Sequence, residues 1–184
     1  MHYTGTIWRP PYEAYSLLVQ VTAGCTHHSC KFCTLYEDLP FKFKLSPFSE
    51  VKADLAEASK YYRKIPRIFF TGANPFVLNT EKLKTLAKMV KEYYPFYKTI
   101  GCFARITDIM PKSLEDLKEL RALGYDGITI GVETGDDESL TFMNKGFQSK
   151  DVLEQCRKLD GAGISYNFFY LTGIYGAGRG EVGA

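Results

Sequence analysis

The sequence predicts an α/β fold built around a parallel sheet of about five strands. Short apolar runs alternate with stretches of helical periodicity, and helix-start signals stand at several of the boundaries. Strands that alternate with helices of this length form parallel βαβ units whose strands are covered by helices. Of the 184 residues 45% are hydrophobic, no linker-like tract interrupts them, and residues 1–184 are expected to form one domain.

Five apolar runs are the expected strands. Each is short and ends at polar or turn-forming residues, as strands buried under helices do. They cover residues 16–21, 67–71, 99–104, 127–132 and 164–172. This pattern alone fits both a β/α barrel and an open doubly wound sheet.

Four helices are expected between these strands. Ser46-Pro47 is predicted to start the first of them. Ser113, with Asp116 three residues later, is typical of a capping box. Ser149 is predicted to cap the last helix and Gly161 to end it.

The end of the chain departs from the repeat. Residues 173–184 are rich in glycine and have no helical periodicity, so a barrel would lack its last β/α units and the chain is expected to be truncated. We expect the free edge of the fifth strand to be covered by this tail or by a neighbouring copy.

Charge and hydropathy restrict the partners only weakly. The net charge of +2 gives no argument for a polyanionic partner, and no apolar run is long enough for a bilayer, so a cytoplasmic protein is expected. Residues 41–44 and 61–64 interleave aromatic and basic side chains, as a single-stranded nucleic-acid surface can. Solvated edges are the commoner explanation, and a tRNA substrate is the less favoured alternative.

Three of the five cysteines lie within nine residues, in a loop after the first strand. Cys25, Cys30 and Cys33 form a C-x4-C-x2-C pattern that suits metal ligation better than disulfides. Three thiolates can each bind one iron of a cubane cluster, which leaves the fourth iron open to a substrate.

Two other metal sites are compatible with this loop. Plant-type ferredoxins use the same spacing for a 2Fe–2S cluster with a distant fourth cysteine. Here Cys102 and Cys156 fall in an expected strand and on an apolar helix face, where buried cysteines are common. A zinc site would need His27 or His28 as a fourth ligand from a loop that closes poorly around a tetrahedron.

The cysteine loop resembles that of the radical S-adenosylmethionine superfamily, whose usual pattern is C-x3-C-x2-C with an aromatic residue before the last cysteine. Phe32 stands at that place, while the first spacing here is four residues, as in some variant members. The resemblance spans nearly the whole chain. It implies a partial parallel β/α barrel of the radical S-adenosylmethionine type, with a 4Fe–4S cluster and S-adenosylmethionine as cofactors.

The resemblance also implies where S-adenosylmethionine binds. The backbone of the turn Gly72-Ala73-Asn74 would hold the methionyl amino group, although the acidic residue usual in that turn is replaced, with Asn74 near its place. Arg105 would pair with the methionyl carboxylate.

The end of the expected fourth strand extends the resemblance. Glu133, together with residues 144–146, looks like the segment shared by elongator-type, nitrogenase-cofactor and methylthiotransferase radical enzymes, where such a glutamate contacts S-adenosylmethionine. Apart from the resemblance, Tyr170 is one of the polar residues in the expected fifth strand, which suggest a wall that faces the adenine or the substrate. Outward-facing positions or hydrogen-bonded polar groups in the core are the alternative.

The function that the resemblance implies is reductive cleavage of S-adenosylmethionine to a 5′-deoxyadenosyl radical, which takes hydrogen from an unidentified substrate. A one-electron donor such as flavodoxin or ferredoxin would be needed. An iron–sulfur electron carrier and a catalytically incompetent truncated barrel are the alternatives.

Overall fold

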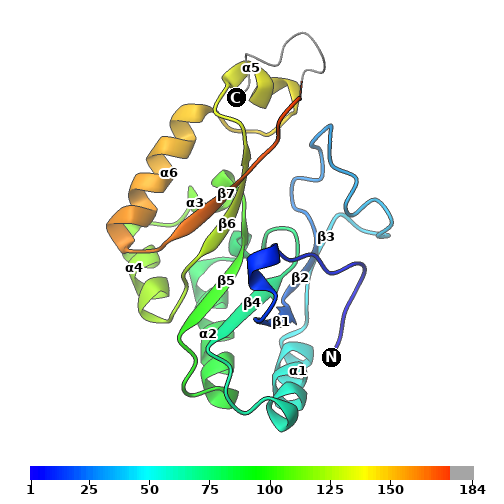
Figure 1. Cartoon of the computed structure of the whole chain (residues 1–184), viewed down its shortest axis with the longest axis vertical. Helices are drawn as coiled ribbons and strands as arrows, with labels where there is room; N and C mark the ends of the chain where they lie inside the picture. The colour runs from blue at the N-terminus through cyan, green and yellow to red at the C-terminus, as the bar shows by residue number, and fades with distance from the viewer. Residues whose placement is uncertain (175–184) are drawn as a thin grey trace.

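A computed structural model describes residues 1–174 and shows five parallel strands in one sheet, in the order in which they occur along the chain (Figure 1). They are β1 (Leu17–Gln20), β4 (Arg67–Thr71), β5 (Thr99–Ala104), β6 (Ile128–Glu133) and β7 (Tyr166–Tyr170). In a doubly wound sheet the strand order reverses at a switch point. Here it never reverses, so the sheet is that of a partial barrel, as predicted.

Helices follow the strands and cover one face of the sheet (Figure 1). The longer ones are α1 (Phe48–Tyr61), α2 (Thr80–Tyr93), α4 (Leu114–Ala122) and α6 (Ser149–Ala162). Shorter turns of helix are η1 (Pro11–Glu13), η2 (Pro75–Val77), α3 (Ile106–Ile109) and α5 (Asp137–Phe142). No helix within residues 1–174 is both long and apolar enough to cross a membrane.

The helix boundaries correct part of the prediction. Ser113 and Asp116 form the expected capping box of α4. Pro47, rather than Ser46, is the N-cap of α1. The N-cap of α6 is Gln148, because Asp151 accepts its backbone N–H, and α6 runs on past Gly161. It ends at Gly163, whose left-handed backbone terminates the helix without a side-chain penalty.

A two-stranded antiparallel hairpin that the sequence analysis did not predict brackets the cysteine loop. It pairs β2 (Thr22–Gly24) with β3 (Phe43–Leu45), and the N–H of Cys25 donates to the carbonyl of Lys42 at 2.8 Å. These strands are three residues long, too short for a clear period-two pattern. The hairpin holds the two ends of the cysteine loop together.

The two faces of the sheet carry different side chains because neighbours in a strand point to opposite faces. Alternate residues such as Ile68 and Phe70 join the apolar core under the helices. On the other face Phe69 and Phe103 meet edge to face, 5.1 Å between ring centroids, and Phe103 lies 6.0 Å from Phe169. That second face is therefore an aromatic wall opposite the helices.

An ion pair closes the end of the sheet at which the strands begin. Arg67, the first residue of β4, donates from Nε to both carboxylate oxygens of Glu13, at 3.0 and 2.9 Å. Its Nη1 donates to Thr99 of β5 and to the Asp126 carbonyl just before β6. Glu13 is fully buried, and one guanidinium thus joins three strands to η1.

The expectation that the glycine-rich tail covers the edge of β7 concerns residues that, from 175 on, lie outside the described part of the chain.

We expect Glu13→Gln to lower the free energy of unfolding by about 2–3 kcal/mol, because it leaves the guanidinium of Arg67 without its counter-charge at a largely buried position. Urea denaturation would measure this. Glu81→Gln is the control, since it removes an exposed partner of Lys84 and should cost at most about 0.5 kcal/mol. Equal effects of the two substitutions would contradict the role of the buried pair.

Candidate functional site

The predicted site residues follow the carboxyl ends of consecutive strands. The cysteine loop follows β1 by way of the short strand β2, residues 72–74 follow β4, and Arg105 follows β5. Glu133 ends β6 and Tyr170 ends β7. Parallel strands end at a common edge of the sheet, so the fold gathers these segments at one edge, where barrels of this kind carry their active sites.

The three cysteines of the loop come together around a small hollow. Cys25, Cys30 and Cys33 are half-buried free thiols, and the other lining residues are His28, Ser29 and Tyr36. Burial raises the pKa of the Tyr36 hydroxyl, and the nearby thiols of Cys25 and Cys33 raise it further. The loop thus places all three thiols around one hollow.

The charges around the hollow suit a bound anion. Burial raises the pKa of the Cys30 thiol, while the neighbouring cations Lys145 and Arg105 act in the opposite direction. A cluster held by three thiolates is anionic, so two adjacent cations favour it. Nδ1 of His28 is buried with no hydrogen-bond partner, which leaves a polar atom free in the wall of the hollow.

Within residues 1–174 no group of three or more His, Cys, Asp or Glu side chains is spaced to enclose a single metal ion. A cubane cluster does not need ligands that converge on one point, because each thiolate binds a different iron. Three half-buried thiols around one hollow fit a 4Fe–4S cluster held by three cysteines.

A segment after α5 fastens the cysteine loop from outside. The N–H of Lys31 donates to the carbonyl of Met143 at 3.1 Å. Nε2 of His27 donates to the carbonyl of Asn144 at 2.5 Å, and Nδ2 of Asn144 donates to the carbonyl of Ser29 at 2.9 Å. The loop, with its longer first spacing, is therefore anchored through residues on both sides of Cys30.

Lys145 joins three residues that the sequence analysis placed at the site. Its Nζ donates to Oε1 of Glu133 at 3.1 Å, and it lies 5.5 Å from the ring centroid of Phe32. Nη2 of Arg105 donates to its backbone carbonyl. Lys145 and Glu133 are both buried, 3% and 8% exposed. The segment 144–146 was singled out in the sequence, but not this ionic role of its lysine.

The turn after β4 packs against the hairpin. Gly72 has φ of 130°, and a Cβ placed there would lie 2.0 Å from Oγ1 of Thr22 and 2.5 Å from its carbonyl oxygen. Asn74 is fully buried, whereas Ala73 is partly exposed. The close approach of β2 therefore explains by itself why residue 72 is a glycine.

Tyr170 stands apart from the other predicted residues. In register it pairs with Glu133, but its side chain is 60% exposed and packs against Phe168, with 5.9 Å between ring centroids. Among the described contacts, none brings its hydroxyl to the cysteine loop.

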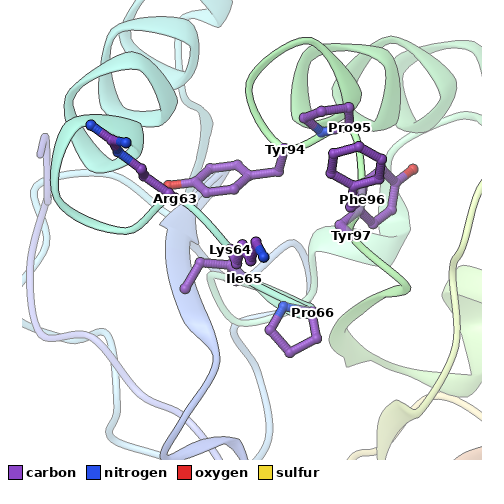
Figure 2. A pocket seen from close by; sticks show the side chains of 8 residues that line it. All are labelled: Arg63, Lys64, Ile65, Pro66, Tyr94, Pro95, Phe96 and Tyr97. Carbon is purple, nitrogen blue, oxygen red and sulfur yellow. The ribbon is translucent and has the colours of Figure 1, made fainter.

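A larger hollow of about 410 Å³ lies at the opposite edge of the sheet, where β4 and β5 begin (Figure 2). Arg63, Lys64 and the ring of Tyr94 line it, with Ile65, Pro66 and residues 95–97. It includes part of the basic and aromatic cluster seen in the sequence. Because the site residues gather where the strands end, this hollow is separate from them.

Comparison with known proteins identifies the family. Residues 19–183 match the radical SAM superfamily, and the chain belongs to that family, which uses a 4Fe–4S cluster and S-adenosylmethionine.

Among curated proteins the chain is 27% identical to an uncharacterized methyltransferase of Synechocystis sp., over 91% of this chain and 31% of that protein. The solved structure of the cobalamin-dependent S-adenosylmethionine radical enzyme OxsB matches with a TM-score of 0.65 and 19% identity, over 85% of this chain and 24% of that one. The radical S-adenosylmethionine methyltransferase TsrM from Kitasatospora setae matches with a TM-score of 0.66 and 16% identity, over 86% and 31%. The chain thus spans about a third or less of these relatives.

We expect Gly72→Ala to lower the free energy of unfolding by at least about 2 kcal/mol, because the added Cβ collides with the backbone and side chain of Thr22. Gly135→Ala is the matched control, since nothing lies within 4 Å of a Cβ there, and should change stability by less than about 0.5 kcal/mol. Both can be measured by urea denaturation of the cluster-free protein. A neutral Gly72→Ala would show that the backbone of β2 does not require this glycine.

Proposed function

We propose that this chain carries the cluster-binding and S-adenosylmethionine-binding part of a radical enzyme, with Cys25, Cys30 and Cys33 as the iron ligands. The observation that supports this most is the gathering of three thiols, two cations and a buried carboxylate at the edge where the parallel strands end. An anionic cluster and the zwitterionic methionyl group of S-adenosylmethionine both require charges of this kind.

Cys25, Cys30 and Cys33 would hold the cluster, which would supply one electron for cleavage of S-adenosylmethionine to methionine and a 5′-deoxyadenosyl radical that takes hydrogen from the substrate. The residues of this chain would bind S-adenosylmethionine and orient it. Nε of Arg105 is buried without a partner, which leaves a donor for the methionyl carboxylate. Glu133 presents a carboxylate from the end of β6, and the turn of residues 72–74 would supply backbone groups for the amino group. A small flavodoxin or ferredoxin would deliver the electron.

The relatives also support a second reaction, methyl transfer. The curated relative is named a methyltransferase, as is one of the matching structures, and two of the structures contain cobalamin. The two reactions leave different products of S-adenosylmethionine: 5′-deoxyadenosine from radical generation and S-adenosylhomocysteine from methyl transfer. Product analysis after anaerobic incubation with a reductant, S-adenosylmethionine and cobalamin as the methyl acceptor would separate them, and an electron carrier would yield neither.

We expect Cys25→Ala, Cys30→Ala and Cys33→Ala each to abolish cluster assembly, because a cluster held by three thiolates has no spare ligand. Iron and sulfide analysis with electron paramagnetic resonance on the anaerobically reconstituted protein would measure this. Cys102→Ala and Cys156→Ala are the controls, since both thiols are buried within the apolar core and should leave the iron content unchanged.

A wild-type protein that holds two irons, or a Cys102→Ala variant that loses its cluster, would favour the ferredoxin-like alternative.

We expect Glu133→Gln and Arg105→Gln to weaken S-adenosylmethionine binding roughly ten- to a hundredfold while iron content stays near wild type, since each removes one charge-assisted hydrogen bond, worth about 1.5–3 kcal/mol. Calorimetric titration of the reconstituted protein would measure the affinity. Glu119→Gln, an exposed partner of Lys84, is the control and should bind as the wild type does. Unchanged binding in both site variants would remove them from the S-adenosylmethionine site.

A further inference from the structure

Asn74 occupies the turn after β4 near the place where the family's usual acidic residue is missing, and it is fully buried. Its Nδ2 donates to Oγ1 of Thr26 at 2.7 Å, and its Oδ1 accepts the N–H of Thr26 at 3.3 Å. Thr26 directly follows the first cysteine. One amide side chain therefore holds the start of the cysteine loop by both of its polar atoms.

The same amide faces a carboxylate from the next strand end. Nδ2 of Asn74 lies 3.1 Å from each carboxylate oxygen of Asp108, in α3. Oδ2 of Asp108 also accepts the backbone N–H of Arg105 at 2.7 Å. Asp108 is 2% exposed, so its carboxylate contacts the turn and the Arg105 backbone away from solvent.

Two other aspartates have the same helix-capping role as Asp108 but differ from it in burial. Asp116 and Asp151 each accept the N-cap backbone N–H of their own helices at 2.8 Å, as Asp108 does for α3. Both are less buried than Asp108, which alone of the three is enclosed against Asn74. Capping a short helix does not by itself require a buried carboxylate that also faces an amide of another strand.

We propose that Asp108, in α3 after β5, is a positioning residue whose buried carboxylate supports the turn after β4. Through Asn74 it holds the cysteine loop, the turn and Arg105 in one fixed arrangement. As far as it concerns S-adenosylmethionine, this proposal rests on the proposed function. Burial raises the pKa of Asp108 to about 6, against the opposing hydrogen bonds from Arg105 and Asn74, so the carboxylate is mostly ionised at neutral pH. Lys112, whose Nζ donates to the Asp108 backbone carbonyl at 2.9 Å, adds a nearby positive charge.

The hydrogen-bond donors and acceptors that link Thr26, Asn74 and Asp108 determine which substitutions break these contacts. Asp108→Asn, with its oxygen kept on the N–H of Arg105, turns an NH2 group toward the NH2 group of Asn74. Asn74→Asp instead sets two buried carboxylates against each other.

An exchanged pair, which combines Asn74→Asp with Asp108→Asn, restores the match. The new amide at position 108 would donate to the new carboxylate at position 74 and still accept from Arg105. That carboxylate would in turn accept both the amide and the hydroxyl hydrogen of Thr26. Every polar group regains a partner.

The experiment compares these two single variants with the exchanged pair, and uses Asp116→Asn as the matched control because that carboxylate has the same capping role in α4. In cluster-free protein, hydrogen exchange would report the protection of the Thr26 amide. In reconstituted protein, the affinity for S-adenosylmethionine and the change that it causes in the electron paramagnetic resonance of the reduced cluster would be measured.

We expect each single variant to lose Thr26 protection and to bind S-adenosylmethionine about tenfold more weakly, with the resonance change reduced. The affinity of the exchanged pair for S-adenosylmethionine should return to within about threefold of wild type, because the effects of substitutions at directly interacting residues are not additive. Asp116→Asn should match the wild type in all three measurements. Circular dichroism of each variant shows whether it is folded.

An exchanged pair as weak as the single variants, or an Asp108→Asn variant that behaves as wild type, would overturn the proposal. If the wild type binds no S-adenosylmethionine, the proposed function fails, but Thr26 protection in the cluster-free variants still decides whether Asp108 holds the loop.

Discussion

Arg67 sets the geometry on which the site depends. A single guanidinium contacts the buried carboxylate of Glu13, the side chain of Thr99 and the carbonyl before β6, and thereby aligns the starts of three strands. A planar fork of five donors can join that many acceptors, which a lysine cannot. Because parallel strands that begin in register also end together, this contact at one edge brings the strand ends together at the other. The cysteine loop, the turn at Gly72 and Arg105 all lie there.

The cysteine loop does not hold itself in place. Its ends are closed by the hairpin, its middle is hydrogen-bonded to residues 143 and 144, and its first residues are held by Asn74. These supports come from the segments after β4 and after α5, and Asp108, after β5, stands behind Asn74. A loop with three thiolate ligands and an extra residue in its first spacing gains its fixed shape from these neighbours, which limits the motion of the thiols before any cluster is bound.

Lys145 links the charged groups of the site to one another. Its ammonium neutralises Glu133 and lies near the rings of Phe32 and Phe147, while its carbonyl receives a hydrogen bond from Arg105. A buried carboxylate and a buried ammonium are tolerated when they satisfy each other. Glu133 is moreover held with φ of 72° beside a register shift in the sheet, a conformation uncommon for a residue with a side chain. The pair thus keeps a strained, charged strand end next to the aromatic residue of the cysteine loop.

The sequence by itself determined the strand and helix order, the C-x4-C-x2-C loop and the family resemblance, because periodicity and local spacing are properties of neighbouring residues. It also placed Glu133 and Arg105 at strand ends. It could not show that Lys145 pairs with Glu133 twelve residues away, that Asp108 faces Asn74 across two strands, or that Arg67 meets Glu13 from η1. Nor did it show the hairpin, whose strands are too short for a periodic signal. Those contacts join residues far apart in the chain, and only the packing of the strands against one another decides which of them meet.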